Sequence, residues 1–358
     1  MKKLKVLVLC GGKSAEHQVS LASAKLIVSE LDRAKYLPEL IFIDRRGRWL
    51  KADGKKLTGK VDAQENDIAA GSKALAPAEN LSGPSVPDVV FPVLHGPLGE
   101  DGTVQGMFEL AGVPYIGCGV LGSALGMDKE ASKLLALKAK LPVLPYLSIH
   151  HAGEAKGAIK NLGLPLFVKP ARLGSSVGIS KVKAPLELAA ALKTAFQYDD
   201  KVIIEKGIEA REIECALLGD PWSDNPRDPL RLKASICGEI EPKAEFYTYK
   251  SKYLDPDGAK LLIPAPIPKE TAQKVRELSL RAFCVLDGYA MARADFLLDK
   301  KTGAVYFNEI NTIPGFTPAS MYPLLWKASG IDTPKLLTLL IELALRRQHK
   351  RSRLKTSP

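Results

Sequence analysis

The sequence predicts an α/β (α+β) protein of several domains that begins with an open parallel sheet. The chain has 358 residues, which is enough for two or three domains. Apolar strands alternate with helical segments over its first third, and this alternation is typical of a parallel sheet covered by helices. Residues 292–298 and 305–311 are two apolar segments separated by a Gly-containing loop, which predicts a hairpin in the C-terminal part.

The composition is that of a globular protein from a reducing compartment. Hydrophobic residues make up 46% of the chain and charged residues 25%. No apolar run is long enough to cross a bilayer, and the first one is too short for a signal peptide. The five cysteines form no CxxC motif, which argues against a disulfide framework and against a zinc site. We therefore expect a cytoplasmic protein without membrane contact.

Positive charge is concentrated at the C-terminal end. The last helix is expected over about residues 333–346, and the formal net charge of the chain is +11. Six positive charges without an acidic neighbour follow in the tail, from Arg346, Arg347, Lys350, Arg351, Arg353 and Lys355. We expect a solvated, frayed end. The alternative is a nucleic-acid-binding arm, but the tail has no interleaved aromatic residue and no binding motif.

The first strand is predicted over residues 5–10, and a Gly-rich turn joins it to a helix that starts near Leu21. The turn contains Gly-Gly-Lys-Ser at positions 11–14, but a P-loop needs a further glycine where this chain has Leu7. The GxGxxG pattern is absent as well. A Gly-rich turn before a helix can still hold an anionic or zwitterionic ligand at the helix N-terminus.

Two polar segments are expected to be loops, and a second buried strand lies between them. Residues 51–87 are rich in Gly, Ala, Ser and Pro, which indicates an insertion or loose region. The strand is predicted over residues 88–94 and leads into His95, followed by a helix over residues 103–111. An isolated histidine after a strand is usually structural. Residues 220–229 contain three prolines and are expected to be a surface loop to which we assign no function.

The central part of the chain contains a loop suited to phosphate binding. A helix is predicted to start at residues 126–129, and the strand over residues 166–168 leads into Lys169. Residues 172–179 then place two glycines and two serines between apolar strands, and backbone N–H groups of such a loop can close over phosphates. An ordinary hairpin turn is the alternative. The setting supports the first interpretation, because Lys169 lies just upstream of the loop and a further apolar strand over residues 202–206 carries an acidic residue at its end.

The C-terminal hairpin carries polar residues at positions that share a face. Arg293 and Asp295 are two residues apart on one strand, and Glu309 and Asn311 are two apart on the other. If the faces match, two carboxylates, an amide oxygen and a guanidinium lie in one patch. This set suits Mg²⁺, which binds through a few carboxylates together with substrate phosphates. An ordinary hairpin with a salt bridge is the alternative, although the Pro-Gly turn directly after Asn311 is typical of a site.

The motifs together resemble one enzyme family over most of the chain. ARADF and NEINTIPGFT resemble the metal-binding end of ATP-grasp ligases. GGKSAEHQVSL, HGPLGEDG and FYTYKSKYLD narrow the resemblance to D-alanine–D-alanine ligases. The resemblance implies a three-domain ATP-grasp architecture. Its parts are an N-terminal α/β domain over residues 1–118, a central ATP-grasp subdomain over 119–208 and a C-terminal subdomain over 209–358 with the metal site and the basic tail.

The resemblance also implies roles for individual residues. The residues implied in catalysis are Glu16, Ser175, Tyr253, Arg293 and Gly315, and those implied in substrate binding are Glu16, His95 and Ser320. The residues implied in ATP binding are Lys129, Lys169, Ser175, Ser176, Glu205, Lys206, Gly207, Ile208, Glu212 and Lys252. The implied metal ligands are Asp295, Glu309 and Asn311. Glu100 is expected to give mainly structural support.

The implied function is the ATP-dependent ligation of two D-alanines for peptidoglycan precursor synthesis. The family forms a D-alanyl phosphate and releases ADP and phosphate. It uses ATP as substrate with Mg²⁺ or Mn²⁺, and two ions are expected. The partners expected from it are D-alanine, ATP and a second copy of the chain in a homodimer, without nucleic acid or membrane.

Three other functions are weighed against this one. A catalytically inactive nucleotide-binding protein would be expected to lack part of the set at Arg293, Asp295, Glu309 and Asn311, and none is missing. Another ATP-grasp carboxylate–amine ligase is opposed by residues at the amino-acid end of the site, namely Glu16, Ser175, Tyr253 and Ser320. A D-alanine–D-lactate ligase is opposed by Tyr253, because relatives that make the ester carry other residues there.

Overall fold

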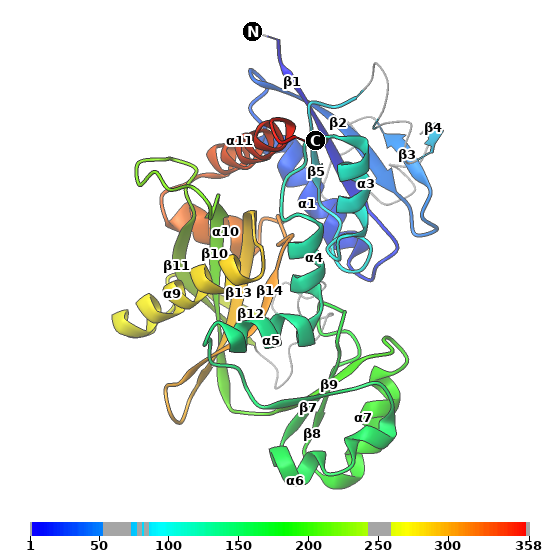
Figure 1. Cartoon of the computed structure of the whole chain (residues 1–358), viewed down its shortest axis with the longest axis vertical. Coiled ribbons are helices and arrows are strands. Elements are labelled where there is room, and N and C mark those ends of the chain that lie inside the picture. The colour runs from blue at the N-terminus through cyan, green and yellow to red at the C-terminus, as the bar shows by residue number, and fades with distance from the viewer. Residues whose placement is uncertain (1, 53–72, 77–80, 82–85, 243–258, 356–358) are drawn as a thin grey trace.

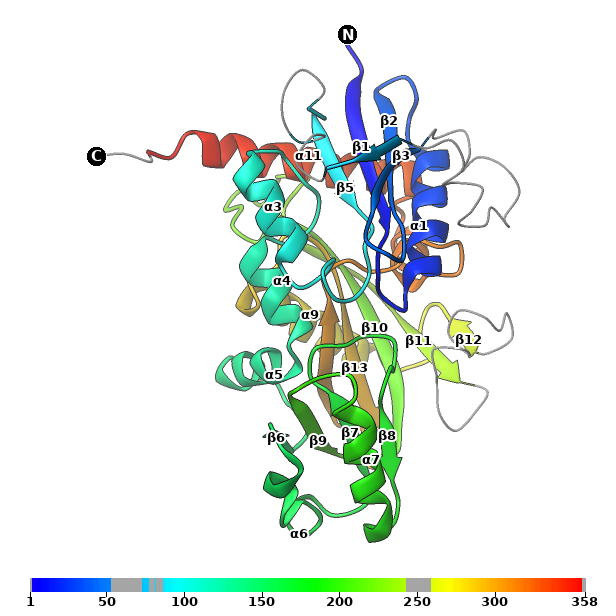
Figure 2. The ribbon, with the colours of Figure 1, turned by 90° about the vertical axis from the view of Figure 1, so that its right-hand side faces the viewer.

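The protein consists of three sheets with helices packed against them. The computed structural model describes residues 2–52, 73–76, 81, 86–242 and 259–355, and the three sheets are those of this part of the chain. The N-terminal and central sheets lie at opposite ends of the molecule, and the C-terminal sheet lies between them (Figures 1 and 2). The predicted mixed α/β fold is therefore confirmed.

The N-terminal sheet has the strand order β4-β3-β2-β1-β5. Its strands are β1 (Leu4–Gly11), β2 (Tyr36–Ile43), β3 (Trp49–Ala52), β4 (Lys73–Leu75) and β5 (Val89–Pro92). β1 pairs in parallel with β2 and β5, as the sequence predicted, and β3 and β4 add an antiparallel edge. β4 lies inside the segment 51–87, much of which falls outside the described residues.

β1 is apolar throughout because both faces of its sheet are covered. Val6 and Val8 pack in the same core as α1 (His17–Glu30), whereas Leu7 and Leu9 pack with residues of α3 (Thr103–Ala111) on the other face. α1 starts at His17, earlier than the predicted start near Leu21. The strand ends at Gly11, which has φ +90°, and a Cβ there would lie 2.1 Å from the backbone oxygen of Ile43. Only glycine fits this turn.

Two helices connect the N-terminal part to the central sheet. They are α4 (Val120–Met127) and α5 (Lys129–Lys138). The helix predicted to start at residues 126–129 is α5, which is confirmed, and α4 was not predicted. Asp128 separates them, and its carboxylate accepts hydrogen bonds from the backbone N–H groups of Glu130 and Ala131. This capping places Lys129 at the first turn of α5.

The central sheet is small and has its own core. Its strand order is β6-β9-β7-β8, with antiparallel pairing throughout. The strands are β6 (Tyr146–Ile149), β7 (Leu166–Pro170), β8 (Ser180–Val182) and β9 (Val202–Lys206). The helical segments are η4 (Ala152–Ala155), α6 (Ala158–Leu162), η5 (Pro185–Glu187) and α7 (Leu188–Ala195). β7 and β8 flank the predicted Gly- and Ser-containing loop.

The C-terminal sheet is antiparallel and has the order β12-β11-β10-β13-β14. Its strands are β10 (Ala210–Gly219), β11 (Lys233–Pro242), β12 (Ala259–Leu262), β13 (Ala290–Asp299) and β14 (Val305–Asn311). α9 (Lys269–Val285) covers one face, and α10 (Met321–Ala328) and α11 (Thr333–Ser352) pack on the other. β13 and β14 form the predicted hairpin. None of the helices in the described ranges is both long and apolar enough to cross a membrane.

The expectation of a solvated, frayed C-terminal tail was wrong. α11 continues through most of the basic stretch and ends at Ser352 instead of near Arg346. Its apolar face, which includes Leu336, Leu340 and Leu343, is buried in a core that also contains residues of the N-terminal and C-terminal sheets. Arg347 lies one turn beyond Leu343 on this face and is only 8% exposed. The helical period therefore carries a basic residue into the interior.

Four basic residues near the end of α11 contact other segments, and we name them the C-terminal clamp. They are Arg346, Arg347, Lys350 and Arg351. Arg346 Nη2 donates to Asp228 Oδ1 at 2.9 Å, and Lys350 Nζ lies 2.7 Å from Asp220 Oδ2. Arg351 pairs with Glu109 of α3. The loop over residues 220–229, to which the sequence assigned no function, thus supplies two carboxylates to this contact.

Arg347 is held by backbone carbonyls and aromatic rings. Its two terminal nitrogens donate to the carbonyl oxygens of Gly117 and Tyr115, each at 2.7 Å. The guanidinium carbon lies 4.2 Å from the centre of the Tyr115 ring and 5.0 Å from that of Tyr289. Tyr289 precedes β13, so this arginine joins the N-terminal part to the start of the hairpin.

Candidate active site

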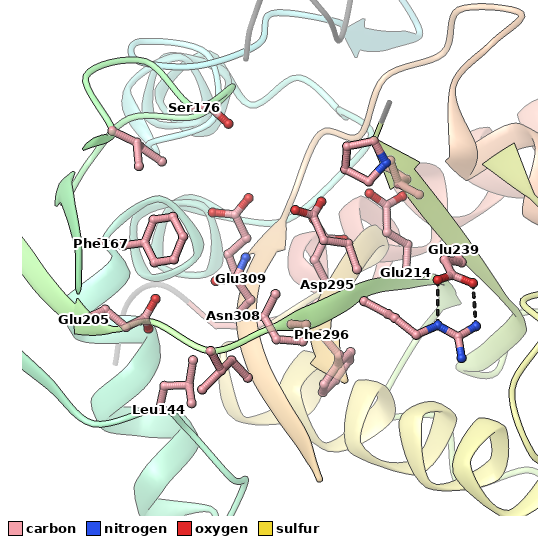
Figure 3. A pocket seen from close by; sticks show the side chains of 18 of the residues that line it. Leu144, Phe167, Ser176, Glu205, Glu214, Glu239, Asp295, Phe296, Asn308 and Glu309 are labelled. Atoms are coloured by element: carbon pink, nitrogen blue, oxygen red, sulfur yellow. Dashed lines mark hydrogen bonds and ion pairs between the residues drawn. The ribbon is translucent and has the colours of Figure 1, made fainter. Parts of the chain in front are cut away.

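A cavity of about 700 Å³ lies between the central and C-terminal sheets. Its walls come from β7, β9, β10, β11, β13 and β14 and from the loop between β7 and β8 (Figure 3). The residues with predicted roles that line it are Lys129, Lys169, Ser175, Ser176, Glu205, Lys206, Ile208, Glu212, Arg293, Asp295 and Glu309. Residues from three parts of the chain that are far apart in sequence therefore meet at one place.

The β13–β14 hairpin builds the predicted polar patch. Arg293 is opposite Asn311 and Asp295 is opposite Glu309, as the two-residue spacing predicted. Arg293 Nε donates to Asp295 Oδ1 at 2.8 Å, and Asn311 Nδ2 donates to Asp295 Oδ2 at 2.9 Å. Asp295 and Glu309 point into the same region of the cavity (Figure 3). The matched faces of the two strands are thus confirmed, and the metal role of the patch stays a prediction.

Glu214 is a further carboxylate of this patch that the sequence reasoning missed. It lies on β10 opposite Asp295, is 4% exposed, and its Oε2 is 3.0 Å from Arg293 Nε. Glu212 and Glu214 are two residues apart on one strand, so the spacing that revealed the hairpin patch could have revealed Glu214 as well. Arg293 lies between two carboxylates, and this arrangement fixes the guanidinium at the cavity wall.

The donor set of the patch fits a divalent cation. Two carboxylates, Asp295 and Glu309, and the amide of Asn311 are oxygen ligands of the kind that Mg²⁺ and Mn²⁺ prefer. No group of three or more His, Cys, Asp or Glu side chains with the geometry of a metal site occurs in the parts of the chain that the structure describes. In phosphate-transfer sites Mg²⁺ is held by one or two carboxylates together with substrate phosphates, and Asp295 and Glu309 could supply these carboxylates.

Two lysines from β7 and α5 contact one buried carboxylate, and we name Glu205, Lys133 and Lys169 the Glu205 cluster. Lys169 Nζ donates to Glu205 Oε2 at 2.5 Å, and Lys133 Nζ donates to Glu205 Oε1. Burial alone would raise the pKa of Glu205, but the two lysines outweigh it and lower the pKa to about 2. Lys133 was missed by the sequence reasoning, although it lies one helical turn after Lys129.

Lys129 connects the hairpin to the loop between β7 and β8. Its Nζ donates to the carbonyl oxygen of Leu173 at 2.6 Å and lies 3.4 Å from Glu309 Oε2. The side chain is 9% exposed. A phosphate in the cavity would therefore meet this ammonium group beside the acidic patch, in keeping with its predicted ATP-binding role.

The loop between β7 and β8 reaches the N-terminal part of the protein. Ser175 and Ser176 have φ values of 51° and 59°, a conformation that costs a residue other than glycine roughly 1 kcal/mol or more. Ser175 Oγ donates to Glu16 Oε1, and a Cβ on Gly174 would lie 3.4 Å from Glu16. Glu16 is 9% exposed. Two of the residues predicted at the amino-acid end of the site, Glu16 and Ser175, are thus in contact.

His95 and Glu100 hold the segment that follows β14. His95 Nδ1 is 2.9 Å from the carbonyl oxygen of Ile313, and Glu100 accepts hydrogen bonds from the N–H groups of Gly96 at 2.7 Å and Ile313 at 3.1 Å. Burial lowers the pKa of His95, so the ring is neutral and donates through Nδ1 to the carbonyl. Burial, together with the nearby Glu16, raises the pKa of Glu100 to about 8. Both residues have structural contacts, and a substrate role of His95 stays a prediction.

Gly315 and Ser320 are neighbours in the turn after the hairpin. A Cβ at Gly315 would lie 2.8 Å from Ser320 Oγ, so a larger residue would displace that hydroxyl. Ser320 Oγ accepts a hydrogen bond from the backbone N–H of Thr317 at 2.9 Å. Of the other predicted residues, Gly207 donates its N–H to the carbonyl of Pro165 at 2.8 Å. Lys252 and Tyr253 lie outside the described residues.

The chain is similar to D-alanine–D-alanine ligases over its whole length. Family models described as D-ala D-ala ligase N-terminus and C-terminus match residues 5–118 and 135–342. A D-alanine–D-alanine ligase of Thermoanaerobacter sp. (strain X514) is 47% identical over 366 aligned positions, which cover 99% of each chain. The D-alanine–D-alanine ligase A of Escherichia coli (strain K12) is 44% identical over 373 positions, which cover 100% of each.

Solved structures give the same result. The D-alanine–D-alanine ligase of Coxiella burnetii superposes with a TM-score of 0.85 at 36% identity and covers 98% of this chain and 97% of its own. A D-Ala:D-Ser ligase of Enterococcus faecalis superposes with a TM-score of 0.82, also at 36% identity, and covers 96% of this chain and 100% of its own. Together with the matched family models and the assembled cavity, these similarities make the chain a member of the D-alanine–D-alanine ligase family, with its ATP-grasp fold.

Proposed function

We propose that this protein joins two D-alanines into D-alanyl-D-alanine at the expense of ATP, for peptidoglycan precursor synthesis. The observation that carries the proposal is the contact of Ser175 with Glu16. It attaches a loop at the phosphate-binding side of the cavity to a carboxylate that can hold the ammonium group of an amino acid. Membership of the family, at 44–47% identity to full-length relatives, supports the same function.

In the first step, the carboxylate of one D-alanine attacks the γ-phosphorus of ATP. A bond forms from the carboxylate oxygen to phosphorus, the bond to the bridging oxygen breaks, and ADP leaves. Lys129 and Lys169 line the cavity where the phosphates would lie, so their charges offset the negative charge on the moving phosphoryl group. Asp295, Glu309 and Asn311 would hold one or two Mg²⁺ or Mn²⁺ ions, which would supply further charge neutralisation there.

In the second step, the amine of the other D-alanine attacks the carbonyl carbon of the acyl phosphate. Arg293 and the backbone N–H of Gly315 would stabilise the oxyanion that forms. Phosphate then leaves with its bonding electrons, and it takes up the proton that the attacking amine loses as the amide forms. Ser320, whose hydroxyl lies next to Gly315, would hold the carboxylate of this D-alanine. Glu16 would hold the ammonium group of the first one. No step needs a covalent enzyme intermediate, and the five cysteines are left without a catalytic role.

A phosphate-release assay with ATP, Mg²⁺ and a panel of D- and L-amino acids and D-lactate tests the proposal. We expect release with D-alanine alone, and D-alanyl-D-alanine as its product. Release without any amino acid, or with L-alanine in preference to D-alanine, would contradict it. Because one similar structure is a D-Ala:D-Ser ligase, D-serine belongs in the panel together with D-alanine in competition. If the main product contained D-serine or D-lactate in its second position, that compound and not D-alanine would be the second substrate.

The assembly and the location of the protein are part of the same proposal. We propose a homodimer in the cytoplasm, with residues 1–118, 119–208 and 209–358 as its three parts. The five cysteines occur as free thiols, which agrees with a reducing compartment. Light scattering at several concentrations measures the mass of the assembly, and a monomer over the whole range would contradict the dimer. Limited proteolysis tests the two boundaries.

A further inference from the structure

Lys133 is a buried lysine whose partner belongs to the proposed ATP site. It is 1% exposed, lies on α5 and donates to Glu205 Oε1. It is not among the described residues that line the cavity, whereas Glu205 and Lys169 are. Glu205 is thus the cavity residue that Lys133 contacts directly in the described part of the chain, and it is the shortest route by which Lys133 can influence a bound nucleotide.

The charges of the Glu205 cluster do not balance. Each oxygen of Glu205 contacts one lysine, Oε1 contacting Lys133 and Oε2 contacting Lys169. The two lysines and one carboxylate leave one positive charge, and Lys169 is the member that reaches the cavity. Without Lys133, the pair of Lys169 and Glu205 would be neutral. A lysine already paired with a carboxylate attracts phosphate weakly, because the carboxylate competes for the same ammonium group.

Burying a lysine is costly, and a purely structural site would be served as well by an apolar residue. Burial lowers the pKa of Lys133, and the attraction of the Glu205 carboxylate offsets this effect only in part. Keeping the charged ammonium group buried therefore costs free energy. The centre of the Tyr146 ring lies 5.9 Å from Lys133 Nζ. A buried ammonium group at Lys133 has a function if it neutralises the carboxylate of Glu205, which lines the cavity.

We propose that Lys133 is a positioning residue for ATP. It neutralises the carboxylate of Glu205 from the side that faces away from the cavity, and so leaves the positive charge of Lys169 available to the nucleotide phosphates. The proposal rests on the proposed function, since it assumes that ATP binds in this cavity. It predicts that loss of Lys133 weakens binding of the phosphates and leaves binding of the nucleoside part almost unchanged. A merely structural role predicts that both fall together.

The experiment measures the dissociation constants of adenosine and of a non-hydrolysable ATP analogue by calorimetry on the full chain. For Lys133→Met we expect the analogue to bind about 10- to 100-fold more weakly, the size of one lost charge-assisted contact. Adenosine should change by less than about threefold. A fall of equal size for both ligands, or no change for either, overturns the proposal.

A double variant separates the charge effect from a loss of packing. In Lys133→Met/Glu205→Gln the competing carboxylate is absent, so Lys169 should again favour phosphate. We expect the ratio of the two dissociation constants to return most of the way to that of the unmodified protein. A ratio that stays at the value of the single variant means that charge on Glu205 is not the cause, and this overturns the proposal even if Lys133→Met is poorly stable.

Lys201→Met is the matched control. Lys201 is also largely buried and lies 2.6 Å from Asp128 Oδ2 and 2.9 Å from Glu130 Oε2. The cap of α5 is made by the other oxygen, Asp128 Oδ1, so loss of Lys201 removes a buried charge near α5 and leaves the cap in place. Lys201 does not contact Glu205 in the structure, so Lys201→Met should leave the ratio of the dissociation constants of the ATP analogue and adenosine unchanged. A change in this ratio equal to that of Lys133→Met overturns the proposal. The result is independent of the phosphate-release assay, because nucleotide binding is measured without D-alanine. A protein that binds the ATP analogue but makes no D-alanyl-D-alanine contradicts the proposed function and leaves the Lys133 test valid.

Discussion

The hairpin patch and the C-terminal clamp both join distant segments through charged side chains, but their charges are arranged differently. In the patch, the carboxylates of Glu214, Asp295 and Glu309 face the cations of Arg293 and Lys129, which leaves an excess of negative charge at a cavity. In the clamp, each of three cations has one carboxylate, and Arg347 is held by carbonyls and rings. The extra cation of the clamp, Arg347, is buried and held by two carbonyl oxygens and two rings, which makes it a structural contact. The extra negative charge of the patch lies at the wall of a cavity, which is the arrangement expected of a ligand site.

The largest effect is expected at the patch. Glu309→Gln removes a charge that the proposed reaction needs, so kcat should fall on the order of 10²- to 10³-fold, the scale of one lost electrostatic contact in a transition state. The free energy of unfolding should change little, because Glu309 lies at a cavity wall. Turnover at saturating Mg²⁺ and a denaturant titration measure the two quantities. Near-normal turnover of Glu309→Gln would contradict a role of the hairpin patch in the reaction.

The clamp should show the opposite behaviour, with stability affected more than catalysis. Arg347→Met leaves the carbonyls of Tyr115 and Gly117 without their donors in a buried place, so the free energy of unfolding should fall by about 2–5 kcal/mol. Deletion of residues 346–358 should lower the free energy of unfolding by at least the same amount, because it removes Arg347 together with the rest of the clamp. Urea titration of each variant measures the loss. A folded Arg347→Met protein of normal stability would show that the clamp contributes nothing.

The Glu205 cluster allows a test by pH. The pKa of Glu205 is lower in the folded protein, at about 2, than the ordinary value of 4.5, so its ionised form stabilises the fold above about pH 4.5. This contribution is lost as the pH falls from about 4.5 towards 2. The difference in unfolding free energy between the unmodified protein and Glu205→Gln should therefore shrink with acidification. A difference that is constant between pH 6 and 3.5 would contradict the assigned charge state.

The smallest effect is expected for the exposed member of the clamp. The Lys350 side chain is 56% exposed, so solvent weakens its pairing with Asp220, and Asp220 also accepts a hydrogen bond from the N–H of Trp222. Lys350→Met should lower the free energy of unfolding by about 1 kcal/mol or less. The same urea titration measures it. A loss as large as that of Arg347→Met would mean that ion pairs, and not the buried carbonyl contacts, hold the clamp.

The comparison also explains what could be predicted from the sequence. The patch was predictable because the spacing of Arg293 and Asp295 on one strand sets their face, and the hairpin brings Glu309 opposite with a short loop between. The clamp could not be predicted from the sequence, because the partners of Arg346 and Arg351 lie 118 and 242 residues away along the chain. A basic stretch at a chain end looks solvated until its acidic partners are located in space.

The Glu205 cluster lies between these two cases. Lys169 and Glu205 were predicted from motifs, but Lys133 was not, although it lies on the same face of α5 as Lys129. Its contact with Glu205 spans 72 residues and depends on how α5 packs against the central sheet. The break at Asp128 could have been predicted, since an aspartate followed by helix-forming residues is an N-cap signal.

The distribution of apolar side chains has a consequence for how the protein melts. Under α11, residues of the N-terminal sheet such as Val6 and residues of the C-terminal sheet such as Ala216 share one core, whereas the central sheet has a separate core. Heating should therefore give two cooperative units and not three, and a calorimetric trace should resolve into two heat-absorption peaks. A nucleotide bound between the central and C-terminal sheets links the two units, so it should draw the peaks together. The shape of the melting trace would then report how fully the cavity is occupied.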